Sequence, residues 1–302
     1  MSGTASLPFP AWPGEVRAAG RYRLFVRAGG AGEPAVYVHG LGGSSTNWTD
    51  LMGLLDFDGL APDLPGHGRS PAAPDGRYRL STHVAAVTAL IESTGRGPVH
   101  LFGNSLGGAA STLVAAQRPD LVRSLTLISP AFPQLDPRRI AEARMALLLL
   151  PGAPWLAQRM AARVTPEQRV RAVLELCYAD PSRITAERMD EAVADARRHA
   201  EDDWAERAFV ASARGLVASY LLPGRRSLWS AAGRVTAPVT LIWGAQDALV
   251  PVSIAPRVRA AFTRAAGGAT LDVFEDAGHV AQMELPERTA SAVRRHTTAQ
   301  SA

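Results

Sequence analysis

One serine in this chain lies in a context that exposes its side chain as a nucleophile. Ser105 is the centre of the Gly-Asn-Ser-Leu-Gly stretch at 103–107, between an apolar run at 98–102 and a run of small residues at 108–116. The flanking glycines permit a sharper backbone bend than other residues adopt. In a strand, turn and helix setting such a bend presents the serine to substrate, and the free N–H groups at the start of the helix favour negative charge. Because short strings of this kind also arise by chance, the prediction requires a base, an acid and oxyanion donors elsewhere.

A carboxylate and an imidazole follow two later strand-like runs. Asp247 comes after the first of these runs and His279 after the second, and groups beyond the C-terminal strand ends of an open α/β sheet meet at one edge. His279 would take the proton of Ser105 and return it to the leaving group, while Asp247 would fix the imidazole tautomer and stabilise the imidazolium. Glu275 and Asp276 are nearer to His279 in sequence, but adjacent residues at a strand end point in divergent directions. Asp247 is therefore the predicted acid.

A glycine-rich turn upstream of the serine supplies backbone donors. It follows the apolar run 35–38 and reads His-Gly-Leu-Gly-Gly at 39–43. The N–H groups of Leu41 and Leu106 are predicted to hold the oxyanion of an acyl transfer. A phosphate loop is excluded because neither Gly-Lys-Ser/Thr nor Gly-x-Gly-x-x-Gly spacing follows, and His39 is predicted to hydrogen-bond the loop. Three neighbouring residues are expected to contact the substrate: Gly40, Gly42 and Asn104.

Metal and cofactor chemistry finds little support in the sequence. The loop at 63–70 carries an aspartate and a histidine, but its spacing fits no compact metal-ligand motif, so a rigid turn is the predicted role. Cys177 is the single cysteine, which excludes an intramolecular disulfide and a cysteine-based metal cluster. No lysine is present, which excludes a lysine Schiff base. We expect no metal and no cofactor.

The order of apolar runs predicts an α/β fold with a mostly parallel sheet. Strand patterns occur in the first part of the chain at 22–27, read as an edge strand, and at 35–38, 60–63, 99–102 and 125–128. Helix patterns lie between them at 48–55, 80–94 and 106–117. From 132 to 233 only helix patterns remain, after which strand patterns at 239–243 and 270–274 and a helix pattern at 286–295 complete the chain.

Composition limits the class of protein. A chain of 302 residues with 47% hydrophobic and 20% charged residues can bury a large core, and one catalytic domain with an insertion is expected. The start of the chain has no signal-peptide pattern and no run reaches the length of a membrane span, so we expect a cytoplasmic protein without membrane insertion. The net charge of +4 is spread over arginines mixed with acids, which argues against nucleic-acid binding. The oligomeric state stays open.

In these motifs the chain resembles the α/β-hydrolase fold superfamily, in particular its small esterase, C–C hydrolase and haloperoxidase-like group. The resemblance implies a mostly parallel eight-stranded sheet flanked by helices, built from residues 20–131 and 234–298, with a helical cap at 132–233 and an N-terminal extension at 1–19. A serine at the elbow differs from the carboxylate of epoxide hydrolases and haloalkane dehalogenases. Val280 stands where C–C hydrolases carry tryptophan after the histidine, although Gln282 and Glu284 keep part of their pattern.

Three functions therefore follow from the sequence. The first is a cofactor-independent serine hydrolase acting on a small-molecule carboxylic ester. The second is a C–C bond hydrolase of the meta-cleavage type, with haloperoxidase-type chemistry beside it. The third is a non-catalytic protein that binds a ligand under the cap, which an intact triad argues against.

Overall fold

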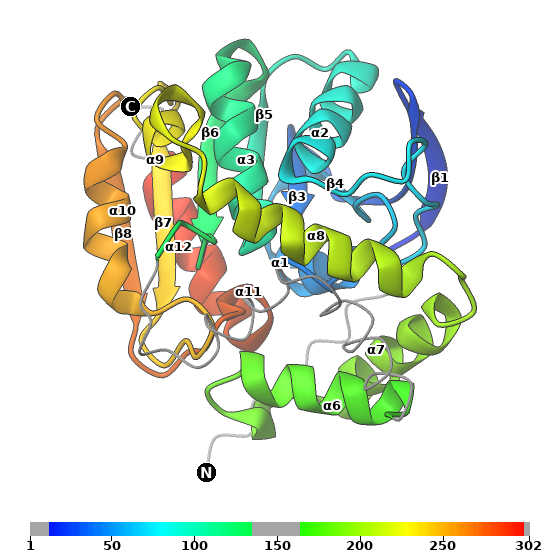
Figure 1. Ribbon diagram of the computed structural model, residues 1–302. Coiled ribbons are helices and arrows are strands. Elements are labelled where there is room, and N and C mark those ends of the chain that lie inside the picture. Colours follow the sequence, from blue (N-terminus) through cyan, green and yellow to red (C-terminus); the bar gives the residue numbers. More distant parts are fainter. Residues whose placement is uncertain (1–11, 135–163, 299–302) are drawn as a thin grey trace.

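The computed structural model describes residues 12–134 and 164–298 (Figure 1). The strands of these residues form one eight-stranded sheet in the order β1-β2-β4-β3-β5-β6-β7-β8. Strand β2 pairs antiparallel with both β1 and β4, and the remaining neighbours pair parallel. The strands are β1 (Gly14–Ala19), β2 (Tyr22–Gly29), β3 (Glu33–Val38), β4 (Phe57–Pro62), β5 (Val99–Asn104), β6 (Val122–Ile128), β7 (Val239–Gly244) and β8 (Ala269–Phe274).

Helices cover both faces of the sheet. One face packs against α2, α3, α9 and α10, and the other against α1 and α12. In Figure 1 the arrowhead of β7 points toward the end of the molecule where α6 and α7 lie. The helices are α1 (Thr49–Leu54), α2 (Leu80–Thr94), α3 (Leu106–Gln117), α6 (Pro166–Cys177), α7 (Ala186–His199), α8 (Ala205–Tyr220), α9 (Leu228–Ala232), α10 (Ala255–Ala261), α11 (Ala281–Glu284) and α12 (Pro286–Thr298).

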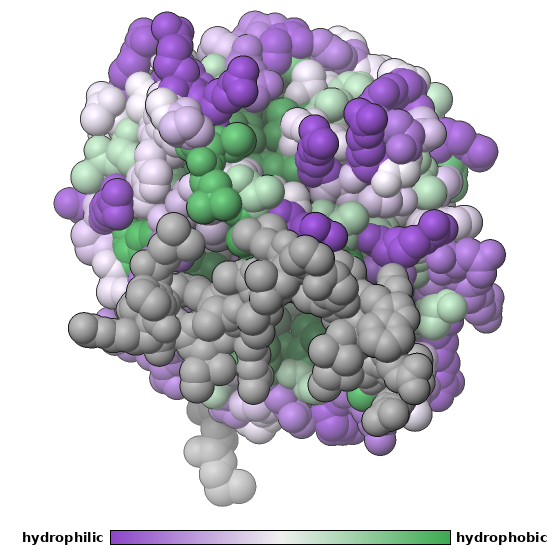
Figure 2. Space-filling model, in the orientation of Figure 1, coloured by the Kyte–Doolittle hydropathy of each residue, from purple (hydrophilic) through white to green (hydrophobic). Residues whose placement is uncertain are grey.

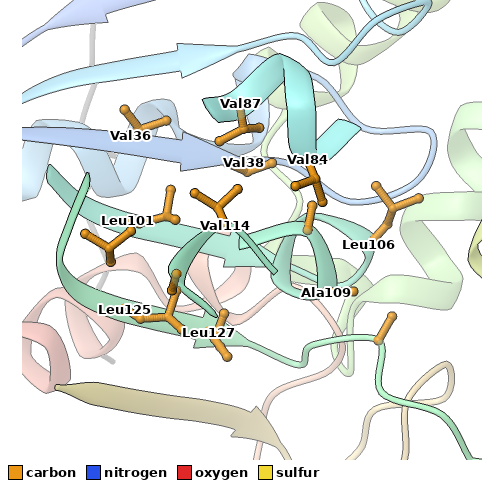
Figure 3. Packing of buried hydrophobic residues seen from close by; sticks show 14 of the residues in the cluster. Val36, Val38, Val84, Val87, Leu101, Leu106, Ala109, Val114, Leu125 and Leu127 are labelled. Carbon is orange, nitrogen blue, oxygen red and sulfur yellow. The ribbon is translucent and has the colours of Figure 1, made fainter. Parts of the chain in front are cut away.

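The two cores follow from the alternation of side chains along each strand. On β3, Val36 and Val38 face α2 and α3, whereas Ala35 and Tyr37 face α1. Both sets are buried, which explains why the central strands read as continuous apolar runs. Figure 3 shows the packing on the α2 and α3 side, with Val36, Val38, Leu101, Leu125 and Leu127 from the strands and Val84, Val87, Leu106, Ala109 and Val114 from the helices.

The predicted fold class is confirmed, and the bounds of α2 and α3 match the predicted ones. Two details of the prediction are wrong. Strand β1 was missed, and it lies inside the predicted N-terminal extension; most of its residues are exposed, so it carries little apolar signal. As a consequence β2 is not an edge strand, because β1 covers its outer side.

Between β6 and β7 the described residues form helices and no strand, as the sequence predicts. Helices α6, α7 and α8 follow one another there, and Thr165 and Thr185 cap the first two with side-chain acceptors. Residues 135–163 of the predicted cap lie outside the described residues, so the division into core and cap stays a prediction. Among the described residues, no helix combines the length and apolarity required to cross a membrane.

Candidate active site

The predicted elbow is present at the junction of β5 and α3. Ser105 adopts φ 53° and ψ −118° between the last residue of the strand and the first of the helix. A non-glycine residue in this region is strained by roughly 1–3 kcal/mol. The surrounding backbone holds it there, because its N–H donates to Ile128 O (3.2 Å) and its carbonyl accepts from the N–H groups of Ala109 (3.0 Å) and Ala131 (2.9 Å). The side chain is half-buried and therefore within reach of substrate.

Helix α3 lies unusually close to the sheet, and small residues make this possible. A Cβ on Gly107 would lie 2.2 Å from Val38 O and 2.5 Å from His39 O, and one on Gly103 would lie 2.6 Å from Gly107 O. These distances are far below any normal contact between heavy atoms. The glycines on both sides of Ser105 are therefore required for the close approach of the helix and the strands. The sequence motif alone does not show whether these glycines serve this close packing or only the turn.

The predicted oxyanion donors lie on either side of the serine. Leu106 is the first residue of α3, so its N–H has no partner within the helix. Within the described part of the chain, no acceptor takes up the N–H of Leu41 or Leu106. A Cβ on Gly40 would lie 3.1 Å from Ser105 Cβ, so the 39–43 turn lies against Ser105. Gly42 has φ +72°, the region that glycine adopts without strain.

Asp247 and His279 form a buried pair. His279 Nδ1 lies 2.8 Å from Asp247 Oδ2, and the side chains are 4% and 0% exposed. The other oxygen, Asp247 Oδ1, accepts the N–H groups of Leu249 and Val250, each at 2.8 Å. Oδ1 thus accepts two backbone hydrogen bonds, and these fix the orientation of the Asp247 carboxylate. The Nδ1 proton is held by the aspartate, and Nε2 is left as the basic atom.

Asn104 connects the nucleophile elbow with the histidine loop. Its side-chain Nδ2 donates to Ile128 O (3.0 Å) and to His279 O (3.1 Å), and the residue is 4% exposed. The residue before Ser105 is therefore hydrogen-bonded to the main chain of His279. The substrate contact predicted for Asn104 rests on its Oδ1 alone, since both amide hydrogens are used within the protein. No hydrogen bond between Ser105 and the imidazole is among those of the described residues; in unliganded enzymes this bond is often long.

His39 has the structural role that the sequence predicted for it. Its Nδ1 lies 2.7 Å from Gly40 O, and its Nε2 accepts the N–H of Leu64 at 2.9 Å. It is part of a buried histidine cluster, His39, His67 and His83, whose adjacent rings lie 5.5 and 5.6 Å apart. Burial lowers the pKa of His39 to about 4 and that of His67 to about 3, and it lowers the pKa of His83 as well. The cluster, which includes the first residue of the 39–43 turn, therefore consists of neutral imidazoles.

The 63–70 loop is the rigid turn that the sequence predicted. Asp63 Oδ1 accepts the N–H of Ser45 (2.6 Å) and Oδ2 that of Arg69 (2.7 Å). Ser70 Oγ donates to Asp63 O (2.6 Å) and accepts from Phe25 N (2.8 Å). The loop thus connects β2 to the residues that follow the 39–43 turn, and its carboxylate accepts hydrogen bonds from main-chain N–H groups.

Two residues of the insertion adjoin the site. A Cβ on Gly42 would lie 3.0 Å from the ring of Phe209 on α8, and this phenylalanine is 45% exposed. Nothing in the sequence links Phe209 to the 39–43 turn, and only the fold brings them together. At the end of α6, burial raises the pKa of the Cys177 thiol to about 12, which keeps it protonated and unreactive.

Comparison with known proteins agrees with this geometry. The sequence model of the alpha/beta hydrolase fold family matches residues 34–286. Lipase LipV of Mycobacterium tuberculosis is 30% identical over 283 residues, which cover 90% of this chain and 96% of the lipase. The dihydrolipoyllysine-residue acetyltransferase component of the acetoin cleaving system of Cupriavidus necator is 28% identical over 278 residues, and the match covers 90% of this chain. It covers 65% of that protein, so the chain spans less than two thirds of its length.

A solved structure shows the same fold. The 2-hydroxy-6-oxo-6-phenylhexa-2,4-dienoate hydrolase of Rhodococcus sp. strain RHA1 superimposes with a TM-score of 0.74 at 20% identity, over 95% of this chain and all of its own. The resemblance read from the sequence motifs is therefore confirmed at the level of the family. The chain belongs to the alpha/beta hydrolase fold family.

Proposed function

We propose that this protein hydrolyses carboxylic esters with Ser105, His279 and Asp247 as its catalytic triad. The observation that carries the proposal is the buried hydrogen bond between Asp247 and His279 on a loop that Asn104 connects to the elbow of Ser105. A hydrogen-bonded acid and base, on a loop that is bonded to the residue before a half-buried serine, support the arrangement that nucleophilic acyl transfer requires. Ligand binding alone requires none of the three.

In this mechanism each group has one task. Ser105 Oγ attacks the ester carbonyl while His279 Nε2 takes its proton, and the same proton then goes to the departing alcohol. The backbone N–H groups of Leu41 and Leu106 hold the oxyanion; loss of one such donor costs roughly 3–4 kcal/mol of transition-state stabilisation in related sites. Water then cleaves the acyl-serine with His279 as the base. The 0% exposure of the Asp247 side chain keeps its charge close to the imidazolium and away from solvent screening.

The ester substrate is supported by the relatives and by the surroundings of the site. Lipase LipV and the monoacylglycerol lipase abhd6-B of Xenopus laevis, 29% identical over 286 residues, carry names of ester hydrolases. Phe209 places a half-exposed aromatic ring on the 39–43 turn, and the inference about the substrate rests on this contact. A further apolar patch is visible in Figure 2 where α8 ends, at which Leu221 is 61% exposed. We infer an apolar acyl or alcohol group. The cap at 132–233 and a cytoplasmic location stay predictions.

A fluorophosphonate probe tests the triad directly. The wild type should be labelled at Ser105 and Ser105→Ala should not, with ester turnover at least about 10⁴-fold lower. Ser111→Ala is the matched control, because this buried serine lies on the same helix and should leave labelling unchanged. Labelling that survives in Ser105→Ala would refute the assignment.

The C–C hydrolase is the second candidate, since the solved neighbours include a dienoate hydrolase of the same fold. Val280 argues against it, because the C–C hydrolases that the chain resembles carry tryptophan at this place. A turnover panel of aryl esters of graded acyl length, run beside a ring-fission dienoate, separates the two. Faster turnover of the dienoate than of every ester would select C–C hydrolysis.

A further inference from the structure

A buried carboxylate outside the triad holds the histidine loop. Glu284, the last residue of α11, is 4% exposed and its side chain 0% exposed. Its Oε2 accepts the N–H of Gly278 at 2.7 Å and that of Ala179 at 3.2 Å. Its Oε1 accepts the N–H of Asp180 at 2.9 Å and Nη1 of Arg183 at 3.1 Å. One side chain thus binds the residue before His279 and the segment that follows α6.

Arg183 binds both the histidine loop, at Asp276, and the carboxylate of Glu284 that holds this loop. Its Nη1 donates to Asp276 O (2.6 Å) as well as to Glu284, and its Nη2 lies 3.1 Å from Asp276 Oδ2. Asp276 is three residues before the catalytic histidine. The guanidinium fork therefore fixes the start of the histidine loop in a defined orientation, which a point charge such as lysine does not do.

The main chain of His279 is held at both ends by other parts of the protein. Its N–H donates to Cys177 O at 2.7 Å, and its carbonyl accepts from Asn104 at 3.1 Å. A Cβ on Gly278 would lie 2.3 Å from Cys177 O, so the two segments touch at the backbone. Cys177, at the end of α6, accepts the bond from the His279 N–H, and Asn104, at the elbow, donates the bond to its carbonyl. The position of the imidazole is therefore set jointly by β5 and by the end of α6.

We propose that Glu284 and Arg183 are positioning residues of the hydrolase, which hold His279 in register with Ser105 by fixing its loop to segment 177–183. The inference rests on the proposed ester hydrolysis and extends it. Neither side chain is required to touch substrate in this role. Segment 177–183 then contributes to the chemical step, because the carboxylate that holds Gly278 also holds the backbone of Ala179 and Asp180.

The consequence for catalysis is a loss of turnover with little loss of binding. Displacement of a catalytic group by about 1 Å costs on the order of 10²-fold in rate. In Glu284→Gln no orientation of the amide restores the site, because each carboxylate oxygen accepts two donors and the new NH₂ faces one pair in either rotamer. The loop must move to relieve this repulsion, and His279 moves with it.

The test measures kcat per active site, with the number of sites counted by fluorophosphonate titration. This readout removes the effect of a smaller folded fraction, which is all that a purely structural role would produce. We expect Glu284→Gln to lower kcat per site by tenfold to a hundredfold with KM within threefold, in line with the cost of misplacing a catalytic group. Arg183→Lys should lower it less.

Two controls match these variants. Glu275→Gln changes an exposed acid of the same loop, and Arg288→Lys changes an arginine that binds Asp276 from the exposed side at 2.7 Å. Both should keep wild-type kcat. Folded Glu284→Gln with wild-type kcat per site would overturn the inference; if that variant does not fold, wild-type kcat in Arg183→Lys overturns it. A wild type that neither hydrolyses esters nor is labelled at Ser105 would instead refute the proposed function.

Discussion

Replacement of Asp247 by asparagine gives a prediction that the structure determines in detail. Asp247 Oδ1 accepts two backbone N–H groups, those of Leu249 and Val250, while Oδ2 lies 2.8 Å from His279 Nδ1. In Asp247→Asn the amide oxygen must occupy the position of Oδ1, because an NH₂ there would face two donors. The NH₂ then points at Nδ1 and donates to it. The imidazole is forced to carry its proton on Nε2, where it cannot accept the proton of Ser105.

The expected loss is large and confined to the chemical step. The wrong tautomer lowers kcat by about 10⁴-fold in a related triad, which corresponds to about 5.5 kcal/mol of transition-state stabilisation. We expect the same order here, since the pair is 4% and 0% exposed and solvent does not replace the lost contact. Steady-state turnover of an aryl ester measures the effect, with protein concentration taken from absorbance and the folded fraction from circular dichroism, because the variant should also react slowly with a fluorophosphonate. KM should change little.

A second Asp–His pair provides the control. Asp272 on β8 accepts from His296 on α12 at 3.0 Å, and its side chain is 26% exposed. Asp272→Asn makes the same chemical change on the same sheet, and we expect it to leave turnover within twofold of the wild type. Retention of more than a tenth of wild-type kcat in Asp247→Asn would refute the orientation argument and with it the role of Asp247.

Three further predictions follow from the packing and the buried polar groups. Gly107→Ala places a Cβ 2.2 Å from Val38 O and should cost on the order of 1–3 kcal/mol of stability together with most of the activity, whereas Gly233→Ala, with its nearest atom at 3.6 Å, should cost less than about 1 kcal/mol by urea unfolding. Asn104→Leu removes two buried hydrogen bonds and should lower both the melting temperature and kcat; an unchanged kcat would exclude its role in holding His279. The buried histidine cluster should destabilise the protein in acid, because burial lowers the folded-state pKa values of its three members below 6.5. Between pH 6.5 and about 5 the unfolded chain therefore binds more protons, and stability should fall as the pH falls, by at most about 1.4 kcal/mol per pH unit for each histidine. An unfolding free energy that is unchanged from pH 7 to 5 would contradict that reading.

The sequence predicted the parts of the site that lie in short motifs. The elbow at Ser105 is readable because glycine, serine and glycine have a specific conformational meaning between a strand and a helix. Asp247 and His279 are readable because each follows an apolar strand, and strand ends meet at one edge of a parallel sheet. The central strands are buried on both faces and give continuous apolar runs, which explains why the fold class followed from the order of these runs.

The parts that the sequence did not reveal depend on contacts between distant segments. Strand β1 is mostly exposed and lacks an apolar pattern. Phe209 meets Gly42 across more than 160 residues, and Glu284 meets Ala179 across 105. Glu284 could be noted only as part of a family pattern, because an acid in a four-residue helix carries no sign of burial. Such residues become visible only when the structure shows which donors surround them.

The residues that short motifs reveal and those that only the structure reveals are connected through the strained backbone of Ser105. Ser105 is kept at positive φ by bonds to Ile128, Ala109 and Ala131, so the elbow is stable only while β6 and α3 are in place. Asn104 then carries this fixed geometry over to His279, and segment 177–183 holds the histidine from the other side. A change in the insertion that shifts the end of α6 should therefore alter turnover without touching the nucleophile. The proposed triad would in this sense depend on β5, β6 and α3 and on segment 177–183 together.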